Sequence, residues 1–162
     1  MSSAPLLEVR GLKKYFPIKA GLLRRTVGEV RAVDDVSFSL LPGETVGLVG
    51  ESGCGKTTLG RTLLRALEPT AGEVRLRLPD GETVDVAALG PRALRRVRPH
   101  LQMIFQDPYA SLDPRMTVLE IISEPLVISG ALRGRALTER VKFLMNVVGL
   151  EVKHLHRYPH EF

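Results

Sequence analysis

The spacing of apolar and polar residues predicts a chain that combines strands with helices. Strands are expected where apolar and polar positions alternate, or where a short run is rich in Val, Thr and Phe. These segments are residues 7–10, 30–33, 36–40, 44–49, 73–78, 83–86 and 101–105. Pro42 and Gly43 predict a turn, and residues 79–82 predict a hairpin turn. The basic insert at residues 19–28 predicts a loop or hairpin.

Helical patterns occupy four other segments: residues 58–67, 91–98, 117–128 and 138–148. Thr117 is followed three residues later by Glu120, which is the arrangement of a capping box. Gly130 and Gly134 lie in the loop between the last two helices, and residues 158–162 predict an extended tail. Mixed strands and helices in 162 residues indicate about one domain of the α/β class.

One segment carries a specific chemical motif. Residues 50–57 read Gly-Glu-Ser-Gly-Cys-Gly-Lys-Thr and fit the phosphate-binding loop Gly-x-x-x-x-Gly-Lys-Thr at every fixed position. Backbone N–H groups and the positive end of the following helix would surround phosphate oxygens. Lys56 would reach the β- and γ-phosphates, and the Thr57 hydroxyl would ligate Mg²⁺. We therefore expect a nucleotide-binding site at this loop.

Composition and charge mainly exclude other classes of protein. No apolar run approaches the roughly 20 residues of a membrane span, and the N-terminus lacks the pattern of a secretory signal. A single cysteine excludes an internal disulfide and fits a reducing compartment. The net charge is +5, but the arginines are spread out without interleaved aromatic residues. We therefore expect solvated basic faces and no nucleic-acid partner.

Two further features have a plain and a chemical interpretation. His154, His156 and His160 lie close together without a cysteine, and we expect exposed polar residues rather than a metal site. Cys54 occupies a variable position of the loop, next to a helix N-terminus that can lower a thiol pKa. We interpret Cys54 as a tolerated small residue, with a reactive thiol as the alternative.

The acidic residue that a phosphate-loop hydrolase needs is missing from this sequence. Such enzymes hold the Mg²⁺ shell with an acidic residue at the end of another apolar strand. After Phe105 the aspartates are Asp107 and Asp113, and neither ends an apolar run. Glu151 does follow one, but Gly149 and the preceding helical pattern argue against a strand there. The chain therefore presents phosphate-binding groups without a complete catalytic site.

Two further sequence motifs make the interpretation of the phosphate-binding loop more specific. Residues 103–115 read Met-Ile-Phe-Gln-Asp-Pro-Tyr-Ala-Ser-Leu-Asp-Pro-Arg, and residues 158–162 read Tyr-Pro-His-Glu-Phe. With the loop, these phrases resemble the ATP-binding subunit of an ABC transporter, in the dipeptide/oligopeptide importer branch. The resemblance covers residues 6–162 and implies an α/β fold, with a P-loop NTPase core, an N-terminal antiparallel β-subdomain and the start of a helical subdomain. It implies that residues 1–105 form the β-subdomain and part of the P-loop core, and residues 106–162 the Q-loop and part of the helical subdomain.

The resemblance also implies roles for single residues. ATP and Mg²⁺ would be bound by Gly50, Glu51, Ser52, Gly53, Cys54, Gly55, Lys56, Thr57, Thr58 and Phe16. Phe16 would stack on adenine, with Tyr15 as the alternative. Gln106 matches the Q-loop glutamine, which contacts Mg²⁺ and the attacking water. Lys56 and Gln106 are thus the implied catalytic residues, and Thr57 and Gln106 the implied metal ligands.

The implied function is coupling of ATP binding and hydrolysis to import of peptides or similar solutes. The implied partners are integral-membrane permease subunits, a second ATP-binding subunit arranged head to tail and, indirectly, a solute-binding protein, at the cytoplasmic face of the cell membrane. The family's signature motif, Walker B residues and switch histidine are not among these 162 residues. We therefore expect this chain alone to lack turnover and to be marginally folded with an exposed apolar edge. A truncated, non-hydrolysing remnant is one alternative, and a small phosphate-loop kinase, which also needs an acidic metal partner, is another.

Overall fold

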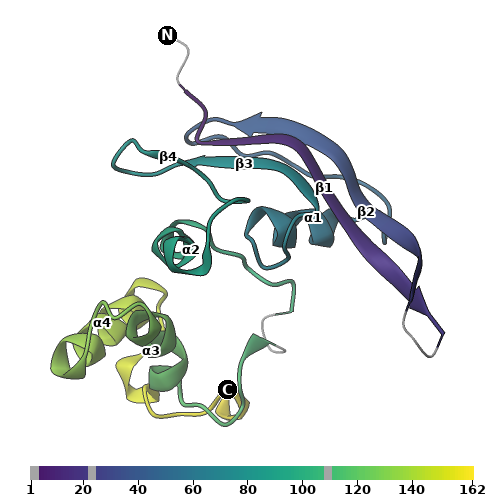
Figure 1. Cartoon of the computed structure of the whole chain (residues 1–162). Coiled ribbons are helices and arrows are strands. Elements are labelled where there is room, and N and C mark those ends of the chain that lie inside the picture. Colours follow the sequence, from purple (N-terminus) through teal and green to yellow (C-terminus); the bar gives the residue numbers. More distant parts are fainter. Residues whose placement is uncertain (1–3, 22–24, 108–110) are drawn as a thin grey trace. The chain divides into compact units, whose positions relative to one another are not determined.

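The computed structural model describes residues 4–21, 25–107 and 111–162, and the chain divides into two compact units. The first unit runs to Met103, and the second runs from Ile104 to Phe162. The first unit is built on a four-stranded antiparallel sheet with the strand order β2-β1-β3-β4 (Figure 1). Its strands are β1 Leu7–Ala20, β2 Arg25–Leu40, β3 Ala71–Arg77 and β4 Thr83–Asp85.

The hairpin of β1 and β2 is much longer than the alternating segments predicted. The predicted strands at residues 7–10, 30–33 and 36–40 are confirmed, and the basic insert is a hairpin whose residues 22–24 lie outside the described residues. Several register shifts interrupt the pairing of the two strands, and Asp35 adopts a positive φ of 57° at one of them. Such bulges bend a ribbon and increase its twist, which lets the hairpin extend beyond the sheet core.

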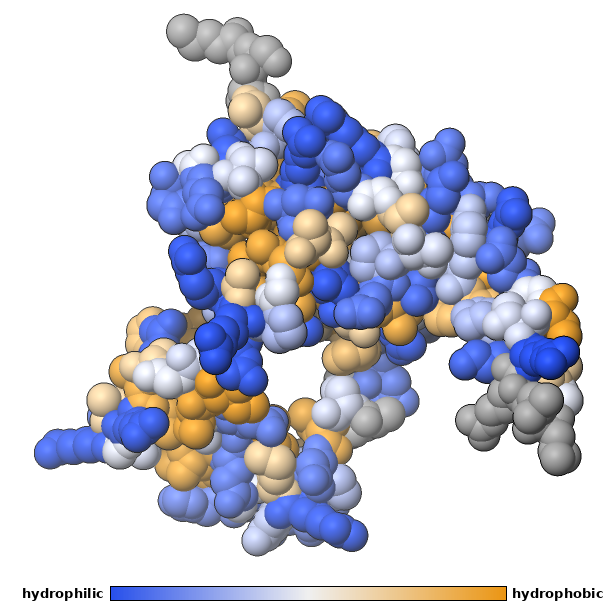
Figure 2. Space-filling view, viewed as in Figure 1, coloured by the Kyte–Doolittle hydropathy of each residue, from blue (hydrophilic) through white to orange (hydrophobic). Residues whose placement is uncertain are grey.

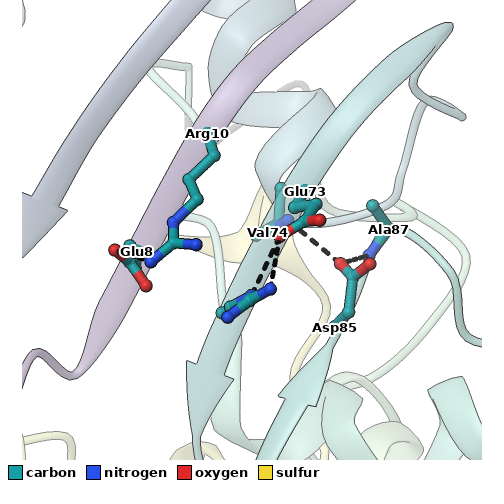
Figure 3. A network of polar contacts seen from close by, with 7 residues as sticks. Glu8, Arg10, Glu73, Val74, Asp85 and Ala87 are labelled. Carbon is teal, nitrogen blue, oxygen red and sulfur yellow. Dashed lines mark hydrogen bonds and ion pairs between the residues drawn. The ribbon is translucent and has the colours of Figure 1, made fainter.

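Asp85 fixes the far edge of the sheet, where β4 ends. Its Oδ1 accepts hydrogen bonds from the backbone N–H groups of Val74 and Ala87, both at 3.0 Å (Figure 3). The first bond ties β4 to β3, and the second turns the chain out of the sheet. The ion pairs Glu8–Arg10 and Glu73–Arg75 lie on the neighbouring strands β1 and β3.

Two helices and a 3₁₀ turn complete the first unit: α1 Lys56–Leu63, α2 Pro91–Val97 and η1 Arg98–His100. Buried side chains of the sheet, α1 and α2 form one core, which contains Val9, Leu12, Val33, Leu59, Val74, Leu76, Leu78, Val86, Leu94 and Val97. Leu59 of α1 lies in this core together with Val33 of β2, so α1 packs on the face of the sheet that carries Val33.

The helix predicted at residues 58–67 ends earlier than expected, at Leu63. Arg65 adopts a left-handed conformation with φ 53°, which a helix cannot continue. Its guanidinium donates hydrogen bonds to the carbonyl groups of Val86 and Leu89, both at 3.1 Å. These bonds give Arg65 a tertiary role that apolar periodicity does not reveal.

Two of the predicted strands are absent, and these predictions are wrong. Residues 44–49 and 101–105 adopt no regular structure, and the described sheet contains β1–β4 alone. Val49 is 94% exposed and Ile104 is 97% exposed. A strand needs a neighbour that accepts and donates its backbone hydrogen bonds. Within the described residues neither segment has such a neighbour, so an apolar sequence alone does not produce a strand.

The second unit is a small helical structure. Its elements are α3 Val118–Ile128, α4 Gly134–Val147 and the 3₁₀ turns η3 Val152–His154 and η4 Pro159–Glu161. Val118, Val141, Met145 and Leu155 form its core. Both predicted helices are confirmed, but α4 begins four residues before the predicted start, at Gly134, which had been expected in the loop.

Two local predictions for the second unit have opposite outcomes. The capping box of α3 is confirmed, because Thr117 Oγ1 accepts from the Glu120 N–H at 3.3 Å and the Glu120 carboxylate accepts from the Thr117 N–H at 2.7 Å. The extended tail is wrong, because residues 159–161 form a 3₁₀ turn. There the Glu161 carboxylate accepts a hydrogen bond from the Tyr158 N–H at 2.7 Å and closes the chain on itself.

Candidate nucleotide-binding site

The glycine-rich loop leads from the exposed residues 44–49 into helix α1. Its backbone conformation depends on Gly53 and Gly55, which have φ values of 82° and 100°. Residues with a side chain rarely adopt such values, which explains the fixed glycine at Gly55, whereas Gly53 occupies a variable position of the motif. The Cys54 N–H donates to the Glu51 carbonyl at 3.3 Å and closes the turn inside the loop.

Gly55 is also restricted by a neighbouring strand. A Cβ atom built on Gly55 would lie 2.1 Å from the carbonyl oxygen of Ala32 on β2. Since that oxygen belongs to the backbone, it has no rotamer through which to move away. The loop is therefore held against β2 at its last glycine. Ala32 cannot be identified from the sequence, because it contributes a backbone atom and its side chain carries no signal.

The N-terminus of α1 is open to an anion. Gly55 is the N-cap and has no side chain that could bond the first N–H groups, and the first turn contains no acidic residue. The first N–H groups of a helix have no acceptor within the helix, and the helix dipole adds a partial positive charge there. Backbone N–H groups of this kind, preceded by a glycine loop, form the usual cradle for phosphate.

Lys56 places its ammonium group inside the loop. Its Nζ donates to the carbonyl oxygens of Gly50 at 2.7 Å and Glu51 at 2.5 Å, and lies 3.6 Å from Cys54 Sγ. The charge is thus held beside the residues that begin the motif. Thr57 follows on the first turn of α1 with an exposed side chain. An ammonium, free N–H groups and a hydroxyl fit the phosphates of a nucleotide and their Mg²⁺.

The two candidate adenine contacts differ in their surroundings. The Tyr15 hydroxyl donates a hydrogen bond to Asp34 Oδ1, which raises the pKa of the phenol, and the Arg31 guanidinium lies 5.3 Å from the ring centroid. Phe16 is partly exposed, with Lys14 Nζ 4.9 Å from its ring centroid. Tyr15 therefore already uses its polar group within the hairpin.

The register of the hairpin relates Phe16 to the loop. Lys14 pairs with the core residue Val33, and Phe16 pairs with Val30. Side chains alternate along a strand, so Lys14 and Phe16 belong to the face that carries Val33, on which α1 packs. Val30 lies two residues along β2 from Ala32, the residue that contacts Gly55.

The structure describes only part of the motif at residues 103–115, which contains the predicted site residue Gln106. Gln106 is exposed and belongs to the second unit, so its position relative to the loop is not defined. Residues 108–110, which form part of the same phrase, lie outside the described residues. The structure therefore brings the loop residues together with α1 and the hairpin, and leaves the Gln106 role as a prediction.

The histidines of the second unit were expected to be exposed polar residues, and the structure differs from this expectation. His154 is half-buried, its ring packs edge-on against Phe162 at 5.3 Å, and its Nδ1 is buried without a hydrogen-bond partner among the described residues. His160 stacks on Tyr158 at 5.5 Å. The described residues contain no group of three or more His, Cys, Asp or Glu side chains that could hold a metal ion.

Comparison with known proteins gives a consistent picture. Residues 33–162 match the family model described as ABC transporter. The chain is 50% identical to the oligopeptide transport ATP-binding protein AppF of Bacillus subtilis over 97% of its length, and 51% identical to the glutathione import ATP-binding protein GsiA of Escherichia coli over 98%. It spans 46% of the first relative and 25% of the second.

A solved structure supports the same fold. The ATP-binding cassette MJ0796, a dimer in a post-hydrolysis state with ADP and Pi, is 23% identical to this chain. The likeness has a TM-score of 0.71 and covers 96% of this chain and 62% of that one. At this identity it shows the fold alone.

Proposed function

This chain belongs to the ABC transporter family, and from that premise we propose that it is the nucleotide-binding part of an importer's ATP-binding subunit. The observation that supports this proposal most strongly is the loop at residues 50–57, with Lys56 Nζ held on its first carbonyl groups at the open end of α1. The fold that was expected from the sequence agrees with the similarity to the solved structure of an ATP-binding cassette.

We assign ATP as the nucleotide and Mg²⁺ as its metal. The residues that would hold them are Gly50, Glu51, Ser52, Gly53, Cys54, Gly55, Lys56, Thr57 and Thr58. The backbone N–H groups and Lys56 would neutralise phosphate charge, and Thr57 would ligate the metal. The metal would draw charge from the phosphate oxygens when bound.

Phe16 is the residue that we propose to stack on adenine. Its place on the α1 face, near the strand residue that contacts Gly55, supports this choice over Tyr15. The hydrogen bond from the Tyr15 hydroxyl to Asp34 also supports Phe16, because Tyr15 could stack on adenine only in an orientation compatible with that hydrogen bond. We expect Phe16→Ala to weaken ATP binding several-fold and Tyr15→Phe to leave it nearly unchanged.

Hydrolysis and transport are proposed for the whole subunit, because the chain spans less than half of the length of these two curated relatives. We propose that Gln106 contacts Mg²⁺ and the attacking water there, and that residues 106–162 begin a helical subdomain after a β-subdomain and core at residues 1–105. The names of both relatives refer to oligopeptide or glutathione transport, which supports small peptides as the solute.

The proposed partners are permease subunits and a second ATP-binding subunit. The dimeric cassette among the solved structures supports the second of these, and the relatives' transport roles support the first. We place the subunit at the cytoplasmic face of the cell membrane as a peripheral component. No helix among the described residues is long and apolar enough to span a bilayer.

Equilibrium binding of a fluorescent ATP analogue with Mg²⁺ tests the proposal. We expect saturable binding to the chain and a loss of at least tenfold in affinity for Lys56→Ala, since that change removes the ammonium from the loop. Lys19→Ala, at an exposed position of β1, changes the net charge equally and is the matched control. Equal affinities of the two variants would exclude the proposed role of the loop.

A further inference from the structure

Positive charge is concentrated in a short part of the first unit. Residues 104–162 contain seven basic and seven acidic residues, so the net charge of +5 lies entirely in residues 1–103. Between Asp85 and Asp107 the sequence contains no acidic residue at all. The same stretch contains four arginines, Arg92, Arg95, Arg96 and Arg98.

Three of these arginines share the exposed side of α2. Arg92, Arg95 and Arg96, called here the α2 arginines, are spaced three and four residues apart and are all exposed. Leu94 and Val97 anchor the helix in the core from its other side. Figure 2 shows strongly hydrophilic side chains at the surface over α2. Arg98 differs, because its guanidinium donates to the Arg65 carbonyl at 3.5 Å.

The charge of the α2 arginines is not neutralised within the described chain. Four of the eight other described arginines of the first unit have carboxylate partners: Arg10, Arg31, Arg65 and Arg75. Among the ion pairs of residues 4–21, 25–107 and 111–162, none includes an α2 arginine. Asp80 and Glu82 line a cavity of about 420 Å³ together with Arg96, so carboxylates border the group on that side.

A group of exposed guanidinium ions matches phosphate oxygens, which they bind in a bidentate manner. Nucleic acid would also supply phosphates, but proteins that bind single strands add aromatic side chains for base stacking, and α2 contains none. Clusters of at least four basic residues on an amphipathic helix are typical of anionic lipid contacts. Arg98 on the adjoining turn brings this cluster to four.

We propose that the α2 arginines contact the phosphate headgroups of an anionic lipid surface. The inference rests on the proposed function in one respect, since a transport subunit works beside a bilayer. The contact is electrostatic, because the apolar side of α2 is buried in the core and has nothing to insert. It therefore weakens as salt screens the charges.

Vesicle co-sedimentation tests this inference with the whole 162-residue chain. We expect binding to vesicles of phosphatidylcholine with 30% phosphatidylglycerol by mole, at about 50 mM salt, and none to phosphatidylcholine alone. The triple variant R92Q/R95Q/R96Q should lose at least tenfold in affinity. The triple variant R133Q/R135Q/R140Q, at exposed positions of the second unit, removes the same charge and should lose less than twofold.

Each outcome decides between explanations. Equal losses in the two triple variants would overturn the proposal in favour of net charge, and tighter binding of a DNA oligonucleotide through the α2 arginines would overturn it in favour of nucleic acid. Circular dichroism of both variants verifies folding, which these exposed positions should not disturb. A chain that binds Mg-ATP but no anionic vesicle refutes this inference alone, whereas binding of vesicles without ATP refutes the proposed function alone.

Discussion

Gly55 shows how one residue joins the loop to the rest of the first unit. It combines a φ of 100° with a position where a Cβ would meet the Ala32 carbonyl oxygen at 2.1 Å. Gly53 has a similar φ of 82° but no atom within 4 Å of its hypothetical Cβ. The two glycines therefore separate the cost of backbone strain from the cost of a clash.

Alanine substitutions at these positions should differ in stability. We expect Gly53→Ala to lower the free energy of unfolding by about 1 kcal/mol, from left-handed strain alone. Gly55→Ala should cost at least about 1 kcal/mol more, since it adds the contact with Ala32. Urea denaturation of both variants measures the difference. Equal losses would mean that β2 does not restrain the loop.

Single residues also show how much of the candidate site could be predicted from the sequence. The motif located the loop residues, and the structure holds Lys56 within that loop. The contact with Ala32 was not predictable, because a backbone carbonyl leaves no trace in residue types. The half-buried His154 was missed because its contact with Phe162 depends on the unpredicted turn at residues 159–161.

At the scale of elements, α3 shows a helix whose beginning is encoded locally. Thr117 and Glu120 satisfy each other's backbone N–H groups, so both residue types at this spacing were sufficient to place the helix start. We expect Thr117→Ala to destabilise the second unit by about 1 kcal/mol, because a backbone N–H loses its acceptor. Thr117→Ser should retain the bond, and helical circular dichroism during urea unfolding compares the two.

The same cap predicts a pH dependence. Hydrogen bonds from the Thr117 backbone N–H and hydroxyl lower the pKa of Glu120 below its ordinary value. A lowered pKa means that its stabilisation is complete above the ordinary glutamate pKa and is lost as pH falls through the folded value. Glu120→Gln should therefore flatten the loss of stability between about pH 5 and pH 3.

Glu139 makes a control for this pH dependence necessary. Its pKa is also lowered, by the hydrogen bond from Lys142 at 2.9 Å, so it titrates in the same range. The measurement is therefore made on Glu120→Gln, Glu139→Gln and the double variant. An unchanged acid profile in Glu120→Gln would contradict the role of the cap.

Elements that depend on distant partners were predicted less well. Strands paired within a hairpin, such as β3 with β4, were found from alternation because the partner is adjacent in sequence. Residues 44–49 and 101–105 have equally apolar sequences, but no strand among the described residues pairs with them. Apolar content shows that a segment can be buried, whereas pairing depends on what lies beside it.

At the scale of the whole molecule, exposed apolar side chains determine how the chain behaves in solution. Val49 and Ile104, in different units, are almost fully exposed within segments that have no backbone partners in the described sheet. Extended apolar segments of this kind favour association between chains. The exposed apolar edge that was expected from the sequence stays a prediction, because these two segments are not strands of the described sheet.

Lysine substitutions at these positions should reduce self-association. We expect Val49→Lys and Ile104→Lys to lower the average mass in static light scattering without lowering the melting temperature, since neither side chain contributes to a core. Val148→Lys, at an exposed position after α4, is the control and should have little effect. A chain that is already a sharp-melting monomer would contradict this prediction.

Binding of nucleotide phosphates by the loop is the central claim, and amide NMR with Mg-ATP tests it most directly. We predict that the largest saturable shifts fall on the backbone N–H groups of residues 50–58, and that Lys56→Ala abolishes them while Lys19→Ala does not. Shifts spread evenly over the chain, or confined to residues outside this loop, would contradict the claim.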